Sequence, residues 1–200
     1  GNSVSSLTIN ETMVKKKIAN LKLKLNSAPG PDKFHPRVLF ELQEEISLPL
    51  YIIFNKSLLS GEVPHDWKLA NVTPVFKKGS CSIAENYRPI SLTSVICKIL
   101  EALICEVVVD HLTNQKLLNT SQHCFVSHRS GLTNLLEYLE TLTTLLDKGH
   151  NIDVFYLDLS KAFDRVPHQR LLAKLKAHGI NGDIYNWFKH GFQTGCNVLC

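Results

Sequence analysis

Residues 155–164 read Phe-Tyr-Leu-Asp-Leu-Ser-Lys-Ala-Phe-Asp, and this stretch decides how the rest of the chain is interpreted. Residues 152–157 are apolar or aromatic with one polar interruption, which predicts a buried β-strand that ends at Asp158. A carboxylate at the end of a buried strand is costly to desolvate unless a cation, a metal ion or hydrogen-bond donors compensate its charge. Asp158 is therefore a candidate metal ligand, and an equally good explanation is that it caps the turn that follows. Asp164 is assigned a structural role.

Outside this stretch, helical patterns alternate with short strands. Apolar residues with helical spacing predict helices over residues 10–25, 36–60, 94–112, 132–148, 166–178 and 183–190. β-branched and aromatic residues predict a strand over 69–76, followed by a turn, and a second strand that starts at Arg88. The leucine stripe of 132–148 predicts a helix that packs into a core. Taken together, the elements predict an α+β fold.

Prolines and glycines divide these elements. Residues 27–32, Ser-Ala-Pro-Gly-Pro-Asp, cannot continue a helix and predict a fixed turn. Gly61 predicts the end of the helix before it, because glycine adopts the left-handed conformation common at helix ends. The helix predicted over 10–25 carries five lysines around its apolar face, a pattern more typical of a solvated face than of a binding site.

Composition excludes several classes of protein. The 200 residues are 44% hydrophobic, enough for one or two cores, and the net charge of +4 permits a polyanionic partner without requiring one. The six cysteines show no metal-binding spacing and are interpreted as reduced residues of an intracellular protein, cytoplasmic or nuclear. No targeting signal and no run of eighteen apolar residues occurs, so no membrane partner is expected. Both ends resemble cuts from a longer chain, and we expect a fragment.

The segment LDLSKAFDRVPH, residues 157–168, resembles the first catalytic motif of reverse transcriptases, in the form found in LINE-type (non-LTR) retrotransposons. Five further segments fall in the order of that family. They are APGPD at 28–32 with His35-Pro36 after it, WKLANVTPVFKKG at 67–79, ENYRPISLT at 85–93, residues 118–130, and LLAKLKAHGI at 171–180. The resemblance covers roughly residues 25–198, and several motifs in one order are far more specific than any one of them.

The resemblance implies a catalytic and metal-binding role for one end of the predicted strand. Asp158 matches the aspartate that binds both divalent cations used for nucleotidyl transfer, which lie about 3.5 to 4 Å apart in such sites. The backbone carbonyl of Leu159 matches a second ligand. Phe163 matches the bulky steric gate that lies under the sugar of the incoming nucleotide and excludes a ribose 2′-hydroxyl.

Two basic residues match those that hold the incoming triphosphate in this family, Lys77 after the first strand and Arg88 at the start of the second. Phosphate favours cationic partners, and arginine can bind it through two parallel hydrogen bonds. Without the surrounding motifs, both would be interpreted as ordinary surface charges. Lys78 is a weaker candidate than Lys77.

The family also implies a fold, a domain division and partners. We expect a right-hand polymerase fold with helix-rich fingers and an incomplete antiparallel palm sheet that begins at residues 152–158. Residues 1–25 are expected to form an N-terminal extension helix leading into the domain, and residues 26–200 a partial reverse transcriptase domain, with the fingers up to about residue 150 and the start of the palm at 151–200. The implied partners are an RNA template, a DNA primer and deoxynucleoside triphosphates, and the implied cofactor is Mg²⁺.

The implied function is RNA-directed DNA synthesis, with one essential part absent. The family completes its two-metal site with a pair of aspartates in a later motif, which does not occur in these 200 residues. Because Asp158 alone cannot hold two Mg²⁺ ions, we expect the site to be incomplete and the chain to be inactive by itself.

Two departures from the family pattern keep other interpretations open. Cys124 stands where the family commonly has glycine, and Cys196 where it usually has arginine, which suggests a copy no longer selected for polymerase activity. The alternative function is a non-catalytic nucleic-acid-binding remnant of such a domain. An unrelated α/β metal-dependent phosphotransferase is a third interpretation, although it leaves the ordered motifs unexplained.

Overall fold

The structure is a computed structural model that describes residues 3–126, 129–159 and 165–194. It divides into two compact units, unit 1 with residues 1–108 and 172–200 and unit 2 with residues 109–171. Phe163, the expected steric gate, and Cys196 lie outside the described residues.

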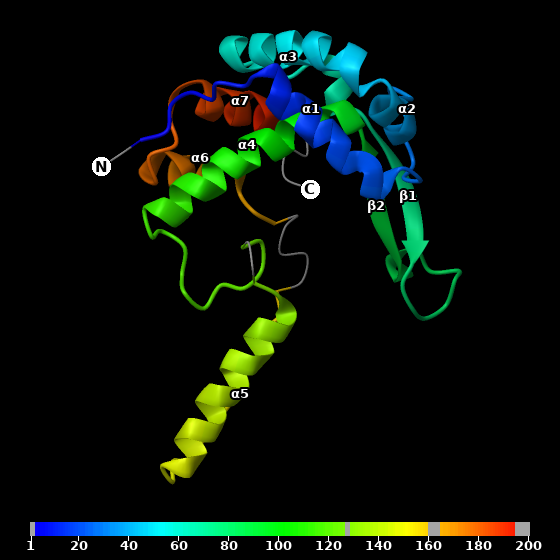
Figure 1. Cartoon of the computed structure of the whole chain (residues 1–200). Helices are drawn as coiled ribbons and strands as arrows, with labels where there is room; N and C mark the ends of the chain where they lie inside the picture. Colours follow the sequence, from blue (N-terminus) through cyan, green and yellow to red (C-terminus); the bar gives the residue numbers. More distant parts are fainter. Residues whose placement is uncertain (1–2, 127–128, 160–164, 195–200) are drawn as a thin grey trace. The chain divides into compact units, whose positions relative to one another are not determined.

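Helices make up most of unit 1 (Figure 1). They are α1 (Glu11–Ala19), the 3₁₀ helix η1 (Asn20–Lys24), α2 (Pro36–Glu41), α3 (Gln43–Ser60), the 3₁₀ helices η2 (His65–Lys68) and η3 (Ala84–Asn86), and α7 (Gly182–Gln193). Two helices continue across the boundary between the units, α4 (Val95–Asn114) and α6 (His168–Ala177). Every helix predicted from the sequence is therefore present, with shifts of a few residues at its ends.

The helix predicted over 36–60 forms as two helices, because the chain leaves helical geometry at Leu42. His35 caps α2 by accepting a hydrogen bond from the backbone N–H of Arg37 at 3.2 Å, and Pro36 occupies the first turn, where a missing N–H costs nothing. Gly61 ends α3 with a φ of 68°, as predicted.

The core of unit 1 forms where α3 lies against α1 and α7 (Figure 1). Its fully buried side chains include Val14, Ile18, Leu39, Phe54, Leu100, Leu103, Ile104, Ile184 and Trp187. The N-terminal helix α1 begins at the cap residue Asn10, whose side chain accepts a hydrogen bond from the N–H of Met13 at 2.9 Å. Since its apolar face is fully buried against α3, α1 is a structural part of unit 1.

The segment before α1 is held to the turn between α6 and α7. The N–H of Val4 donates to the carbonyl of Gly179 at 2.9 Å, and the N–H of Asn181 donates to the carbonyl of Val4 at 2.8 Å. A third bond joins the N–H of Asp183 to the carbonyl of Ser5 at 2.8 Å. Two parts of the chain that are far apart in sequence are thus joined by their backbones.

Two antiparallel strands, β1 (Ala70–Phe76) and β2 (Tyr87–Thr93), form a hairpin in unit 1 (Figure 1). Both were predicted at nearly these positions. Together with the helices they give a mixed helical fold with a two-stranded antiparallel sheet, which confirms the α+β class.

Unit 2 contains α5 (Gly131–Asp147), which begins with a capping box between Ser130 and Thr133. The helix itself was predicted correctly, whereas the prediction that its leucines pack into a core was wrong. Among the described residues nothing covers Leu132, Leu135, Leu136, Leu139 and Leu146, which are 45–65% exposed. An amphipathic pattern defines a helix and its apolar face, but burial of that face depends on a partner element.

The strand predicted over 152–158 is the main correction. These residues have no regular secondary structure, and Phe155 and Leu157 are 87% and 93% exposed. A strand exists only when its backbone N–H and C=O groups pair with a neighbour, and the described part of the chain offers none, because β1 and β2 pair only with each other. A hydrogen bond of 2.7 Å joins the hydroxyl groups of Tyr156, in this segment, and Tyr138, and it raises the pKa of Tyr138.

Candidate nucleotide-binding and catalytic residues

The hairpin places Lys77 and Arg88 on one face. Arg88 pairs with Val75, and the ladder continues one residue beyond β1, because the N–H of Lys77 donates to the carbonyl of Asn86 at 2.8 Å. Residues two apart on a strand share a face, so Lys77 and Arg88 are diagonal neighbours, a relationship that separates residues by about 7–8 Å. Both side chains are exposed. The sequence placed these two cations on separate elements, and the structure brings them together.

The loop after Lys77 is fixed by the side chain of Asn86. Its Nδ2 atom donates to the carbonyl of Ser80 at 2.9 Å, and Gly79 lies so close that a Cβ atom there would stand 2.6 Å from the same nitrogen. Gly79 also has a φ of 90°, which side chains disfavour. The hydroxyl of Tyr87 donates to the carbonyl of Cys81 at 2.9 Å. Lys77 therefore lies at the start of a turn whose conformation is fixed by these hydrogen bonds and by Gly79.

Two prolines face each other across the hairpin, Pro74 and Pro89. Because the pair formed by Lys77 and Asn86 is hydrogen-bonded, alternation makes the Pro74–Pro89 pair a non-bonded one, whose nitrogens point to the outer edges. The prolines thus remove no ladder hydrogen bond, and they remove a donor from each open edge. This arrangement keeps a two-stranded ribbon from recruiting further strands at that level.

Gly30, in the APGPD segment, lies against the end of β2. A Cβ atom on Gly30 would be 2.6 Å from the carbonyl carbon and oxygen of Thr93 and 2.7 Å from the nitrogen of Ser94. The backbone of this turn therefore packs directly on the backbone that follows β2, an approach that only glycine permits. Two segments singled out by the sequence, APGPD and ENYRPISLT, meet at this contact.

Asp158 and Leu159 lie together on the irregular segment of unit 2, and both are exposed. Within the described ranges, no group of three or more His, Cys, Asp and Glu side chains is placed to hold a metal ion. One exposed carboxylate and one backbone carbonyl do not meet the needs of two Mg²⁺ ions, which require several oxygen ligands each. The residues that the structure describes do not by themselves form the metal site that the family implies.

His123 is a buried polar residue that the sequence interpretation missed. Its Nδ1 atom lies 2.9 Å from the Thr133 hydroxyl, and its Nε2 atom lies 2.8 Å from a carboxylate oxygen of Glu137. His123 is 7% exposed, so these contacts attach the QHCF segment to the first turns of α5. A single histidine between a glutamine and a cysteine carries no sequence signal for such a role.

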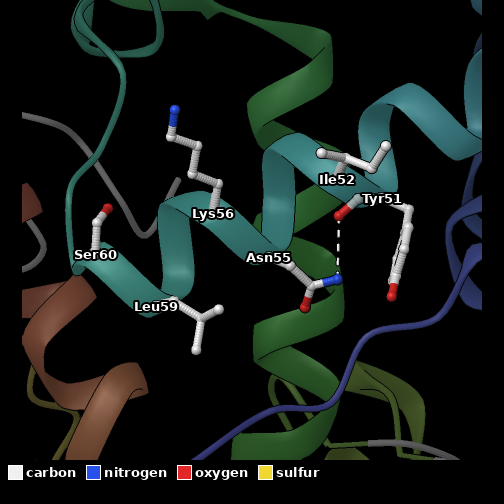
Figure 2. Close-up of a pocket in the computed structure, with 6 residues that line it drawn as sticks. All are labelled: Tyr51, Ile52, Asn55, Lys56, Leu59 and Ser60. Carbon is white, nitrogen blue, oxygen red and sulfur yellow. Dashed lines mark hydrogen bonds between the residues drawn. The ribbon is translucent and has the colours of Figure 1, made fainter.

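A surface hollow of about 730 Å³ lies on α3 (Figure 2). All six residues that line it belong to that helix, namely Tyr51, Ile52, Asn55, Lys56, Leu59 and Ser60. The side-chain amide of Asn55 donates back to the carbonyl of Tyr51 at 3.1 Å, as Figure 2 shows, so it is already engaged. With Lys56 as its one cation, the hollow lacks the convergent charges of a triphosphate site.

The carboxyl group of Glu101, on α4, is mostly buried. Burial raises its pKa above the ordinary value of 4.5, while a hydrogen bond from the Cys97 thiol and the charge of Lys98 act in the opposite direction. The Cys97 Sγ atom lies 3.5 Å from Glu101 Oε1. This group is part of the helical core and is separate from the residues expected to carry chemistry.

None of the described helices combines the length and the continuous apolar surface that a membrane crossing requires.

The sequence profile of the reverse transcriptase (RNA-dependent DNA polymerase) family matches residues 75–198. The chain is 33% identical over 175 residues to the RNA-directed DNA polymerase from the mobile element jockey of Drosophila melanogaster, which covers 86% of this chain and 19% of that protein. It is 30% identical over 173 residues to the probable RNA-directed DNA polymerase from transposon BS of the same species, again 86% of this chain and 19% of the relative. A probable RNA-directed DNA polymerase from the X-element matches at 30% identity over 152 residues, 76% of this chain and 17% of the relative. The chain thus spans about a fifth of the length of these relatives.

Proposed function

Since this chain belongs to the reverse transcriptase family, in its LINE-type form, we propose that it is part of a polymerase domain that copies RNA into DNA. The proposed partners are an RNA template, a DNA primer and deoxynucleoside triphosphates. The observation that carries the proposal is the hairpin of β1 and β2, which presents Lys77 and Arg88, both inside the matched residues 75–198, on one exposed face.

In this proposal the hairpin belongs to the fingers, and its two cations bind the phosphates of the incoming nucleotide. Two positive charges on one face attract a triphosphate, and the guanidinium of Arg88 can hold two of its oxygens at once. The turn at Gly79 and Asn86 already fixes the backbone next to Lys77, so less conformational entropy is lost when Lys77 binds a phosphate. The same proposal assigns the fingers to residues 26–150 and the start of the palm to residues 151–200. It also includes the right-hand arrangement of these subdomains.

Asp158 is proposed as one carboxylate ligand of the Mg²⁺ ions that this family uses, with the carbonyl of Leu159 beside it. Since these two groups do not suffice, the remaining carboxylates have to come from residues other than those that the structure describes. We expect the isolated chain to bind Mg²⁺ weakly and to incorporate no nucleotides, and Phe163 to act as the steric gate once the site is complete.

Primer extension on an RNA template with Mg²⁺ and deoxynucleotides tests the proposal. Three proteins are compared: this chain, the chain extended through a paired-aspartate segment of a LINE-type relative, and the extended chain with Asp158→Ala. Asp153→Ala in the extended chain is the matched control, because Asp153 is an exposed aspartate on the same segment. Incorporation by the extended chain and its Asp153→Ala variant, and its loss in Asp158→Ala, supports the proposal.

The alternative of a nucleic-acid-binding remnant makes a different prediction for the same experiment. Both proposals agree with the observation that the described residues gather no metal-ligand set, so nucleotide incorporation has to separate them. If none of the proteins incorporates nucleotides while the chain still binds RNA in a salt-dependent way, the remnant is the better account.

A further inference from the structure

A second basic surface lies on α6 (His168–Ala177), a helix that carries none of the residues given a role above. From Arg165 to Gly182 the sequence contains two arginines and two lysines and no acidic residue. The helix buries Leu172 and half-buries Leu171 and Leu175, so its apolar side is occupied. Its opposite side is exposed and carries arginine, lysine and alanine side chains.

Helical spacing determines what that exposed side presents. Arg170 and Lys174 are four residues apart, so their side chains are neighbours on one face, with Cβ atoms about 5–6 Å apart. Ala173 and Ala177 are exposed beside them, and Lys176 lies on the flank. Small neighbours leave the cations accessible to an extended, negatively charged strand, which bulky side chains would hold away.

Arg170 and Lys174 differ in their contacts from two of the three lysines of α1. Lys15 and Lys17 of α1 form ion pairs with Glu44 and Glu106 and thus serve the internal structure. Within the described part of the chain, no acidic side chain lies within ion-pair distance of Arg170 or Lys174. Unpaired cations on one helix face provide the positive potential that attracts a polyanion.

We propose that the exposed face of α6, through Arg170 and Lys174, binds the phosphate backbone of the nucleic acid that the polymerase copies. The proposal rests on the proposed function for the identity of the polyanion. The proposed contact is independent of base sequence. Both side chains are cations that can bind phosphate, and no aromatic residue lies on that face to stack on a base.

The test measures binding of this chain to a fluorescently labelled RNA–DNA hybrid by anisotropy at several KCl concentrations. The variant is Arg170→Gln with Lys174→Gln, and the control is Lys22→Gln with Lys24→Gln, which removes the same charge from exposed lysines of η1. Loss of two phosphate contacts should reduce the slope of log affinity against log salt by roughly 1.4–1.8 units. Between about 50 and 200 mM KCl, the original chain should therefore lose roughly tenfold more affinity than the α6 variant.

A charge-conserving variant and a stability measurement serve as further controls. Arg170→Lys with Lys174→Arg keeps both charges and should keep the original slope, and thermal unfolding should show that the α6 variants remain folded, since both side chains are exposed. A slope unchanged in the α6 variant, an equal reduction in the η1 control, or no salt-dependent binding by the original chain would overturn the inference. Normal binding by the original chain, with no nucleotide incorporation by the extended chain, would instead count against polymerase activity and leave the α6 contact standing.

Discussion

The side chain of Ser57 links two distant helices of unit 1 by accepting a hydrogen bond from the indole nitrogen of Trp187 at 3.0 Å. Ser57 belongs to α3 and Trp187 to α7, 130 residues later in the sequence. The same hydroxyl donates to the carbonyl of Glu62 at 2.6 Å, just beyond the end of α3. Ser57 and Trp187 are both buried, so the Ser57 hydroxyl satisfies a buried indole N–H that has no access to water.

Replacing this serine tests the link. Ser57→Ala leaves the buried Trp187 N–H without its acceptor, and a buried unsatisfied polar group costs about 1–3 kcal/mol. We expect the free energy of unfolding, measured by urea denaturation, to fall by that amount. Ser60→Ala on the same helix is the control, because Ser60 is exposed and water can replace its contacts. Equal effects of the two substitutions would contradict the interpretation.

Gly182 has a φ of 57°, and a Cβ atom there would lie 2.2 Å from the carbonyl oxygen of Ser5. Gly182→Ala should therefore break the attachment of the N-terminal segment as well as strain the backbone. Gly149→Ala is the matched control, because Gly149 has a φ of 75° with nothing within 4 Å of its Cβ position. We expect about 1–2 kcal/mol of destabilisation at Gly149, from the backbone alone, and clearly more at Gly182.

Proteolysis distinguishes the two glycine variants further. Release of residues 3–9 in Gly182→Ala should expose them to a protease, whereas Gly149→Ala should leave their protection unchanged. If both variants show the same loss of stability and the same protection, steric contact with Ser5 has no role.

Glu101 predicts a dependence of stability on pH. Because burial raises its pKa in the folded state, the folded chain favours the protonated group, and this contribution is fully present below the unfolded-state pKa. It is lost as the pH rises through the folded-state pKa. The free energy of unfolding of the original chain should therefore fall relative to that of Glu101→Gln as the pH rises from about 4.5 towards neutrality. Denaturant unfolding of both proteins over that range provides the measurement, and parallel curves would contradict the prediction.

Local signals in the sequence were sufficient for the helices and for the two strands, although not for the pairing of those strands. Asn10, Pro36 and Gly61 act on the residues next to them, so caps and stops can be predicted without knowledge of the fold. The strand prediction for residues 152–158 failed because it depended on a feature that is not local. Their apolar pattern is typical of a strand, but a strand also needs a partner that no local pattern supplies.

The features of the candidate site also fall into those that the sequence predicts and those that depend on tertiary packing. The resemblance assigned Lys77 and Arg88 to the incoming triphosphate, and that assignment stays a prediction. The sequence did not show that the two residues lie on one face, which follows from the hairpin register. The contact of Gly30 with Thr93 and the burial of His123 depend on tertiary packing, which a single sequence does not reveal.

Lys77 and Arg88 offer a direct test of the proposed nucleotide site, with Lys78 as a control of equal charge that is also exposed. In the extended chain, Lys77→Gln and Arg88→Gln should each raise the KM for deoxynucleotides by roughly tenfold to a hundredfold, because a hydrogen bond to a charged group contributes about 1.5–3 kcal/mol. Lys78→Gln should change KM by less than threefold. Steady-state primer extension at varied nucleotide concentration gives these values. Equal effects at Lys77 and Lys78 would show that general charge matters and that the hairpin register does not, whereas a selective effect would place the triphosphate against the face that Lys77 and Arg88 share.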